Sequence, residues 1–98
     1  MQERIICAAN WYHTLAKQEH TPKNIDRGVV IGGLRHPFII NTMYSLTGIK
    51  TGSNCIQGFL TNEHRFVDRV EGRKIALAAG QITEDSYHET ELFSEDLY

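Results

Sequence analysis

The segment Arg4–Tyr12, RIICAANWY, constrains the fold more than any other part of the chain. It is rich in β-branched, aromatic and small apolar residues, which favour a strand. Such a strand is apolar on both faces, with Ile5, Cys7, Ala9 and Trp11 on one face and Ile6, Ala8 and Tyr12 on the other. Because apolar side chains on both faces need cover on both faces, the sequence predicts an inner strand of a sheet that is packed on both sides.

Two further strands and a helix are predicted before residue 62. A short apolar run bounded by glycines is typical of a strand, and we expect the first such run to pair antiparallel with the first strand. Proline suits the first turn of a helix, and the apolar residues after Pro37 recur at helical spacing up to Gly48. The predicted elements are a strand at 28–33, a helix at 37–47, a turn at 50–54 and a strand at 56–61, in which Gly58 marks a bulge or a close approach.

The clearest helix signal lies in the second half of the chain. Asp68 and Glu71 have the D-x-x-E spacing of a capping box, and Gly80 stands where a left-handed residue ends a helix. We therefore predict a helix over 69–79, in which Gly72 costs about 1 kcal/mol of helix stability. Its expected apolar stripe consists of Ile75, Ala78, Ala79 and Ile82.

Length and composition limit the class of protein. A chain of 98 residues has room for one domain, residues 1–98, and a monomer of this size is only marginally stable. Cys7 and Cys55 are too few for a disulfide scaffold, and we expect both to be reduced and buried. There is no apolar run for a membrane span and no cationic leader, so we expect a cytoplasmic protein. The sequence predicts an α+β fold, a small antiparallel sheet with two helices.

Charge is divided unevenly along the chain. The net charge is −2, yet residues 1–82 carry +4 and residues 83–98 carry −6. A mildly basic body suits an anionic partner, although this charge is too small for a binder of duplex DNA. We expect residues 83–91 to be flexible. The acidic tail either shields the basic body, pairs with a neighbouring subunit or is simply solvated, and the closing LFSEDLY has apolar side chains that should dock.

Cationic residues mark two places where a strand runs into a helix. Arg35 and His36 precede the first helix, and Arg65 and Arg69 flank the start of the second. Helix amino ends and guanidinium groups both favour phosphate. If the second helix begins near Asn62, Arg65, Arg69 and Arg73 share one face, and Phe38 and Phe66 are placed to stack on a base. Alternatively, these arginines are solvated or pair with Glu63 and Glu71.

Catalytic motifs are weak. The five histidines show no metal-ligand spacing, and no nucleophile motif is present. An acid–base pair of His36 and His64 remains open. We expect no catalytic residue, no metal and no cofactor.

Four blocks of the sequence resemble a known family. They are ICAA in the first strand, PKNIDRGVVIGGLRH before the first helix, QGFLTNEHRFVDRVEGRKIALAAGQI and the closing LFSEDLY, and together they cover most of the chain. The most specific part is GF-x-T-x-x-x-RFVDR-x-E. These blocks resemble the phage Thoeris anti-defence proteins of the first described type.

The resemblance implies a sponge that acts in the cytoplasm of the infected host cell. Such a protein binds a cyclic ADP-ribose-type immune signal and sequesters it without cleavage, so that the downstream effector is not activated. The resemblance also implies a homo-dimer or hexamer with a pocket between subunits, and cyclic di- or trinucleotides as ligands of a separate site.

Site residues are implied in the same way. Arg65 and Arg69 of RFVDR are expected to contact the ligand phosphates, so that loss of either abolishes binding, and Phe38 is expected to stack on the adenine. An asparagine is also implied, with Asn41, Asn54 and Asn62 all open. The full candidate ligand-binding set is Arg65, Arg69, Phe38, Arg35, His36 and Asn62.

Two other functions remain open. One is a small phage RNA- or protein-binding module that uses the same basic patch. The other is a phosphodiesterase that degrades the signal. The sequence does not distinguish between cyclic isomers, and it leaves the oligomer number, the place of a second site and the role of the acidic tail undecided.

Overall fold

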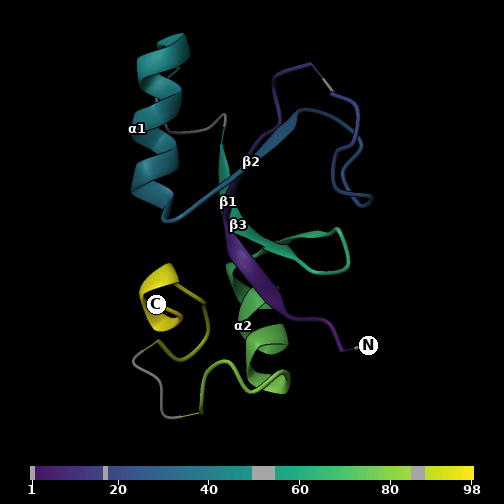
Figure 1. The fold of residues 1–98 in the computed structure, drawn as a ribbon, viewed down its shortest axis with the longest axis vertical. Helices are drawn as coiled ribbons and strands as arrows, with labels where there is room; N and C mark the ends of the chain where they lie inside the picture. The colour runs from purple at the N-terminus through teal and green to yellow at the C-terminus, as the bar shows by residue number, and fades with distance from the viewer. Residues whose placement is uncertain (1, 17, 50–54, 85–87) are drawn as a thin grey trace.

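The computed structural model describes residues 2–16, 18–49, 55–84 and 88–98. Its elements, in chain order, are β1 (Ile5–Tyr12), β2 (Val29–Gly33), α1 (His36–Thr47), β3 (Ile56–Thr61), β4 (Phe66–Asp68), α2 (Arg69–Ala78) and the 3-10 helix η1 (Ser94–Asp96) (Figure 1). The four strands form one antiparallel sheet in the order β2-β1-β3-β4. The predicted α+β class, a small antiparallel sheet with two helices, is confirmed.

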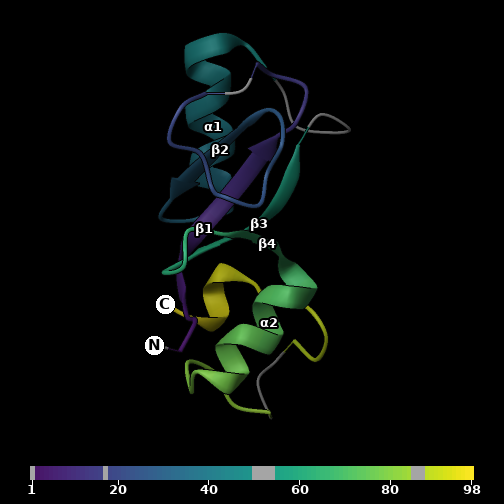
Figure 2. The same ribbon diagram turned by 90° about the vertical axis from the view of Figure 1, so that its right-hand side faces the viewer.

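Strand β1 is an inner strand, as its two apolar faces require. Helices α1 and α2 contribute Ile39 and Ala76 to the larger core cluster, on one face of the sheet. On the other face, the long loop between β1 and β2 brings Ile25 against Ala9 and Phe66 (Figures 1 and 2). The prediction of cover on both faces is therefore confirmed, and the predicted antiparallel pairing of β1 with β2 is confirmed as well.

The start of β1 departs from simple alternation. The pairing of β1 with β3 shifts between Ile5 and Cys7, which is a local irregularity of the β-bulge type. Ile5 consequently joins the helix-side core with Ala8 and Tyr12, whereas Ala9 packs on the loop side. Grouping Ile5 with Cys7 and Ala9 on one face was therefore wrong, because an extra residue in a strand reverses the face of what precedes it.

Helix α1 follows the predicted signals. Pro37 lies in its first turn, and Gly48 ends it with φ of 76° and an N–H that donates to the Tyr44 oxygen at 2.8 Å. Ile39 and Met43 are the buried apolar side chains that face the sheet. The predicted turn at 50–54 lies outside the described residues.

Strand β4 was not predicted. The sequence suggested that a polar turn leads from Thr61 straight into a helix, but Phe66–Asp68 first forms a short strand that pairs with β3. An early helix start near Asn62 is therefore wrong, and Arg65, Arg69 and Arg73 do not share one helix face. Phe66 is buried under the loop and is not free to stack on a base.

Helix α2 packs through its smallest residues. Gly72 and Ala76 are its buried positions, and a Cβ added at Gly72 would lie 3.1 Å from Cδ2 of Phe59. Gly72 therefore allows helix α2 to approach the sheet closely. From the sequence, only the cost of this glycine to helix stability was predicted, and not this packing role. The predicted apolar stripe was wrong at Ala78, which is exposed. Gly80 adopts φ of 75°, as predicted for the residue that ends the helix.

The C-terminal strap, residues 88–98, docks on the body of the same chain. Leu92 is fully buried in the helix-side core, and its N–H donates to the Arg69 oxygen at 2.9 Å. Docking of the closing segment is thereby confirmed. Of the segment expected to be flexible, residues 85–87 lie outside the described part of the chain.

Two global expectations have structural outcomes. Cys7 and Cys55 are free thiols, but both are half-buried rather than buried, and desolvation raises the pKa of each. Within the described ranges, no helix combines the length and the apolar character that crossing a membrane requires.

Candidate anion-binding site

The amino ends of the two helices meet at Gly58 of β3. His36, the first residue of α1, donates from Nε2 to the Gly58 oxygen at 2.7 Å. Gly58 also pairs with Asp68, which precedes α2 and accepts a hydrogen bond from the Glu71 N–H at 2.8 Å. A Cβ at Gly58 would clash with the carbonyl oxygen of Val67, so this glycine is the close approach that the sequence predicted. One backbone position thus holds both helix starts.

Arg69 opens α2 beside this point. Its Nη2 donates to Oε1 of Gln57 at 2.5 Å and its Nη1 donates to the Leu92 oxygen at 2.8 Å. The guanidinium carbon lies 4.2 Å from the centroid of the Phe93 ring, within cation–π range. Desolvation lowers the pKa of Arg69, although acidic residues of the strap oppose this effect. The side chain is therefore half-buried and held in one position.

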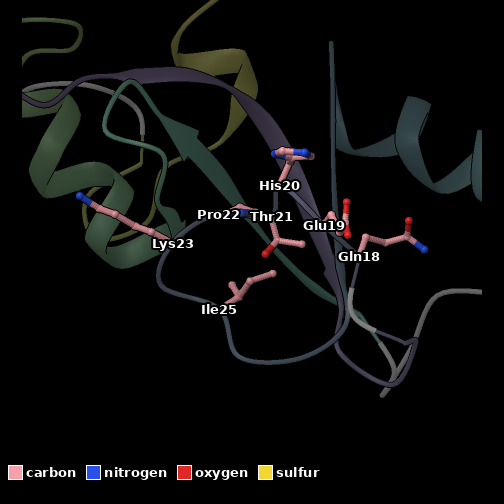
Figure 3. A pocket seen from close by; sticks show the side chains of 7 residues that line it. All are labelled: Gln18, Glu19, His20, Thr21, Pro22, Lys23 and Ile25. Atoms are coloured by element: carbon pink, nitrogen blue, oxygen red, sulfur yellow. The ribbon is translucent and has the colours of Figure 1, made fainter.

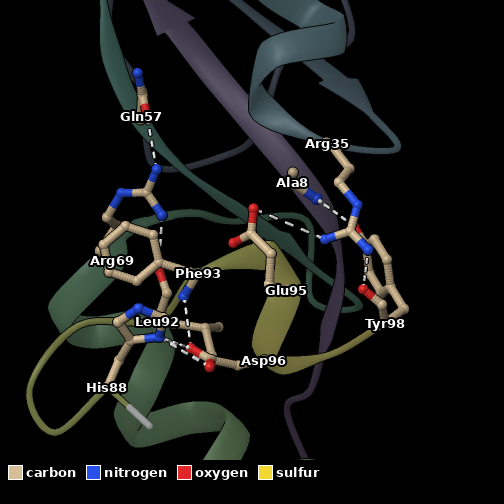
Figure 4. A network of polar contacts seen from close by, with 10 residues as sticks. All are labelled: Ala8, Arg35, Gln57, Arg69, His88, Leu92, Phe93, Glu95, Asp96 and Tyr98. Carbon is tan, nitrogen blue, oxygen red and sulfur yellow. Dashed lines mark hydrogen bonds and ion pairs between the residues drawn. The ribbon is translucent and has the colours of Figure 1, made fainter.

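Arg35 lies on the other side of the strap, immediately before α1 (Figure 4). Its Nη2 donates to the main-chain oxygen of Tyr98, and the Tyr98 ring lies beneath the guanidinium at 5.1 Å. Nη1 is 4.0 Å from Oε1 of Glu95, beyond hydrogen-bond distance, and this buried atom has no hydrogen-bond partner among the described residues. Arg35 therefore retains one donor that a ligand could use.

His36 is committed to the fold. The residue is only 3% exposed, and its ring packs edge-on against Phe59 with centroids 5.2 Å apart. Burial lowers the pKa of His36, which favours the neutral ring. In this structure His36 therefore fixes the start of α1 between Arg35 and the sheet, rather than presenting a free donor.

Phe38 offers an exposed aromatic face three residues after Arg35. It lies in the first turn of α1 and is 58% exposed, and its neighbour Leu34 is exposed as well. The structure therefore leaves this ring available for stacking, as the sequence-based assignment requires.

Arg65 and Asn62 lie apart from this group, in and beside the turn between β3 and β4. Nε and Nη2 of Arg65 each donate to one carboxylate oxygen of Glu3 at 2.8 Å, which raises the pKa of Arg65 and lowers that of Glu3. Oδ1 of Asn62 accepts from the Arg4 N–H at 2.8 Å, and its Nδ2 donates to the Gln2 oxygen at 3.3 Å. Both side chains thus tie the first residues to the turn.

The structure also has hollows on the loop-covered face that the sequence did not indicate. A shallow hollow of about 710 Å³ is lined by Gln18, Glu19, His20, Thr21, Pro22, Lys23 and Ile25 (Figure 3). Beside it, a groove of about 310 Å³ contains Cys7, His20 and His64. The two histidines have φ of 59° and 62°, in the left-handed region. Few signals in a sequence reveal a histidine at positive φ, so this groove could not be found without the fold.

The suggested acid–base pair of His36 and His64 is wrong. His36 packs on Phe59 in the helix-side core, whereas His64 lines the groove on the other face of the sheet. Of the other candidates, Arg73 donates from Nε to the His88 oxygen at 3.0 Å, Asn41 lies exposed on α1, and Asn54 is outside the described residues. No three His, Cys, Asp or Glu side chains in the described part of the chain are grouped to hold a metal.

The structure therefore brings together part of the candidate set. Arg35, His36 and Arg69 lie around the convergence at Gly58, and Phe38 lies in the first turn of α1 with its ring beside Gly33 of β2. Arg65 and Asn62 stay at the β3–β4 turn. Glu95 and Phe93 of the strap are the members of the site that sequence reasoning missed, although the clustered acidic and apolar residues near the end of the chain were a signal.

Comparison with known proteins identifies a family. No curated protein and no solved structure is significantly similar to this chain. Residues 4–98 match the family model described as Phage T4 y16D protein. This supports the phage origin that the sequence suggested, whereas the narrower resemblance to Thoeris anti-defence proteins stays a prediction. Because the match spans nearly all of its residues, the chain belongs to the phage T4 y16D protein family.

Proposed function

We propose that this phage protein binds a cyclic ADP-ribose-type immune signal in the infected host cell and sequesters it without cleavage. The observation that carries the proposal is the convergence of Arg35 and Arg69 beside the amino ends of two helices. Guanidinium groups match phosphate oxygens in geometry and charge, and the amino end of α1, which no side chain caps, adds a favourable dipole. The pyrophosphate of such a ligand presents two anionic groups to these two cations.

The state of each arginine supports this assignment. Arg69 is already held by Gln57, Leu92 and Phe93, so little side-chain freedom is lost when a ligand binds. Arg35 retains a buried Nη1 without a hydrogen-bond partner among the described residues, which a phosphate oxygen would satisfy. Arg65, by contrast, is neutralised by Glu3, and we assign it a smaller part in binding.

The adenine of the ligand stacks on Phe38 in this proposal. The ring is exposed and lies one turn from Arg35, so a base that is joined to the bound phosphates can reach it. Stacking of a base on an aromatic side chain is worth about 1–3 kcal/mol.

A second copy of the chain completes the pocket, in a homo-dimer or hexamer. Helix α1 and the residue before its cap expose four large apolar side chains, namely Leu34, Phe38, Tyr44 and Leu46. Exposed apolar side chains of this size are typical of interaction surfaces, and a subunit packed on the side of Leu34 and Phe38 would exclude water from Arg35. Cyclic di- or trinucleotides are further ligands in this proposal, bound at a separate site.

Sequestration requires slow release rather than turnover. The two histidines that the sequence suggested as an acid–base pair lie on opposite faces of the sheet, which favours binding over phosphodiester cleavage at this site.

A bind-and-release experiment tests the proposal. The purified protein is incubated with cyclic ADP-ribose isomers or cyclic oligonucleotides, freed of unbound ligand and heat-denatured, and the supernatant is analysed by HPLC. We expect intact ligand. Arg69→Gln should weaken binding about 10- to 100-fold, since hydrogen bonds to charged groups contribute about 1.5–3 kcal/mol. Arg27→Gln, which removes an exposed guanidinium, serves as the control.

Each other result has a distinct meaning. A cleaved product would identify a phosphodiesterase and refute sequestration. Full retention by Arg69→Gln would refute the assignment of the site. If no ligand is retained and affinity for RNA rises with oligonucleotide length, the protein is a nucleic-acid-binding module instead.

A further inference from the structure

Glu95 places a carboxylate between the two arginines of the site. It projects from η1 toward the sheet, with Arg35 on one side and Arg69 on the other (Figure 4). Its Oε1 is 4.0 Å from Nη1 of Arg35, in a pair whose side chains are 34% exposed for Arg35 and 62% for Glu95. A pair of this length and exposure is weak, so either partner can exchange it for a better one.

The charge of Glu95 acts on more than one cation. Burial lowers the pKa of Arg69 and that of His36, and the negative charge of Glu95 is among the smaller effects that oppose this lowering at both residues. The position of this carboxylate therefore marks the place where an external anion would interact with the same groups.

The backbone beneath Glu95 is fixed, in contrast to its side chain. Leu92 and Ser94 are buried, and the N–H of Asp96 donates to the Phe93 oxygen at 2.9 Å. Moving the carboxylate away from Arg35 therefore needs only rotation of one exposed side chain, and the strap stays docked.

We propose that Glu95 is an internal competitor, whose carboxylate occupies the position of the ligand's anionic group and has to be displaced when the ligand binds. This inference rests on the proposed function and describes how ligand binding at the same site is regulated. Because every ligand must replace one carboxylate, a singly charged anion gains little from binding. A pyrophosphate carries more charge and spans both arginines, so the site selects compounds of this class.

Calorimetric titration of the full chain with inorganic pyrophosphate and with orthophosphate, at constant ionic strength, tests the inference. We expect Glu95→Gln to bind both anions about fivefold more tightly, the range expected for loss of an exposed charge pair. Glu89→Gln removes the same charge from the strap but lies beside Val70 and Lys74, and its affinity should equal that of the unmodified protein. Glu95→Ala repeats the test without the amide.

The outcomes separate the two proposals. Tighter binding by both Glu95 variants and not by Glu89→Gln supports the competitor. If Glu95→Gln binds no more tightly while Arg69→Gln loses binding, the competitor is refuted and the proposed site survives. If the unmodified protein and all variants fail to bind pyrophosphate and cyclic ADP-ribose alike, both the site and the competitor are refuted.

Discussion

Replacing Gly58 with alanine should disrupt the point on which the sheet and both helix starts depend. The added Cβ would clash with the Val67 carbonyl oxygen and lie 2.7 Å from Cζ of Phe66. Because the first of these atoms belongs to the backbone of β4, the strand itself must move. Strand β4 has only three pairs with β3, those of Gly58, Phe59 and Leu60. Overpacking of this kind costs about 1–3 kcal/mol, and loss of ladder hydrogen bonds adds about 1 kcal/mol each, so we expect about 3 kcal/mol in total.

Urea unfolding followed by circular dichroism measures this loss. Gly80→Ala is the control for a glycine with open space, because nothing lies within 4 Å of an added Cβ there. Its own cost, about 1 kcal/mol, comes from the left-handed backbone at φ of 75°, which Gly58 does not share. Since Asp68 pairs with Gly58 and Arg69 follows it, Gly58→Ala should also weaken pyrophosphate binding, whereas Gly80→Ala should not. A free energy of unfolding for Gly58→Ala equal to that of Gly80→Ala would show that the two strands are not in close contact there.

Two predictions concern pH. Burial lowers the pKa of His36 below its ordinary value of 6.5, so the unfolded chain binds the proton more readily than the folded one. The free energy of unfolding should therefore fall as the pH drops below 6.5. His36→Gln should remove this slope in urea unfolding between pH 5.5 and 7.5. The hydrogen bond from Arg65 lowers the pKa of Glu3 below 4.5. The stabilisation that ionised Glu3 gives the fold is therefore present above pH 4.5 and is lost as the pH falls through the pKa of the folded state. Glu3→Gln should make the free energy of unfolding depend less on pH in this acid range, and an unchanged dependence would contradict this linkage.

The helices were predictable because their signals are local. Pro37 and Gly48 mark the two ends of α1, and Asp68 and Gly80 mark those of α2, each through a backbone preference that acts within one turn. Strand β4 was not predictable, because three residues are too few to show a period of two. The sheet face on which Ile5 lies was mispredicted for a related reason, since a β-bulge cannot be recognised from the alternation of apolar residues.

The site was predictable only in its cations. Arg35 and Arg69 stand next to helix starts, which a sequence pattern can show. Their partners come from the strap, and Arg35 and Tyr98 are 63 positions apart in the chain. Likewise, Arg65 pairs with Glu3 rather than with the nearby Glu63, because the fold brings the first residues against the β3–β4 turn. Contacts of this range depend on tertiary packing, on which helical spacing has no bearing.

The uneven distribution of charge has a physical explanation in this arrangement. The basic body carries +4 and the acidic end −6, and the strap brings part of that negative charge to the arginines. Burial of Arg69 carries a desolvation cost, which lowers its pKa, and acidic residues of the strap, Glu95 among them, oppose this effect. Glu95 also lies 4.0 Å from Arg35, so its carboxylate favours the charged form of both arginines. If Glu95 is the internal competitor that we propose, the same carboxylate leaves when an anion arrives. The stability of the free protein and its affinity for the ligand are then linked through Glu95, so that a change at this position that raises one lowers the other.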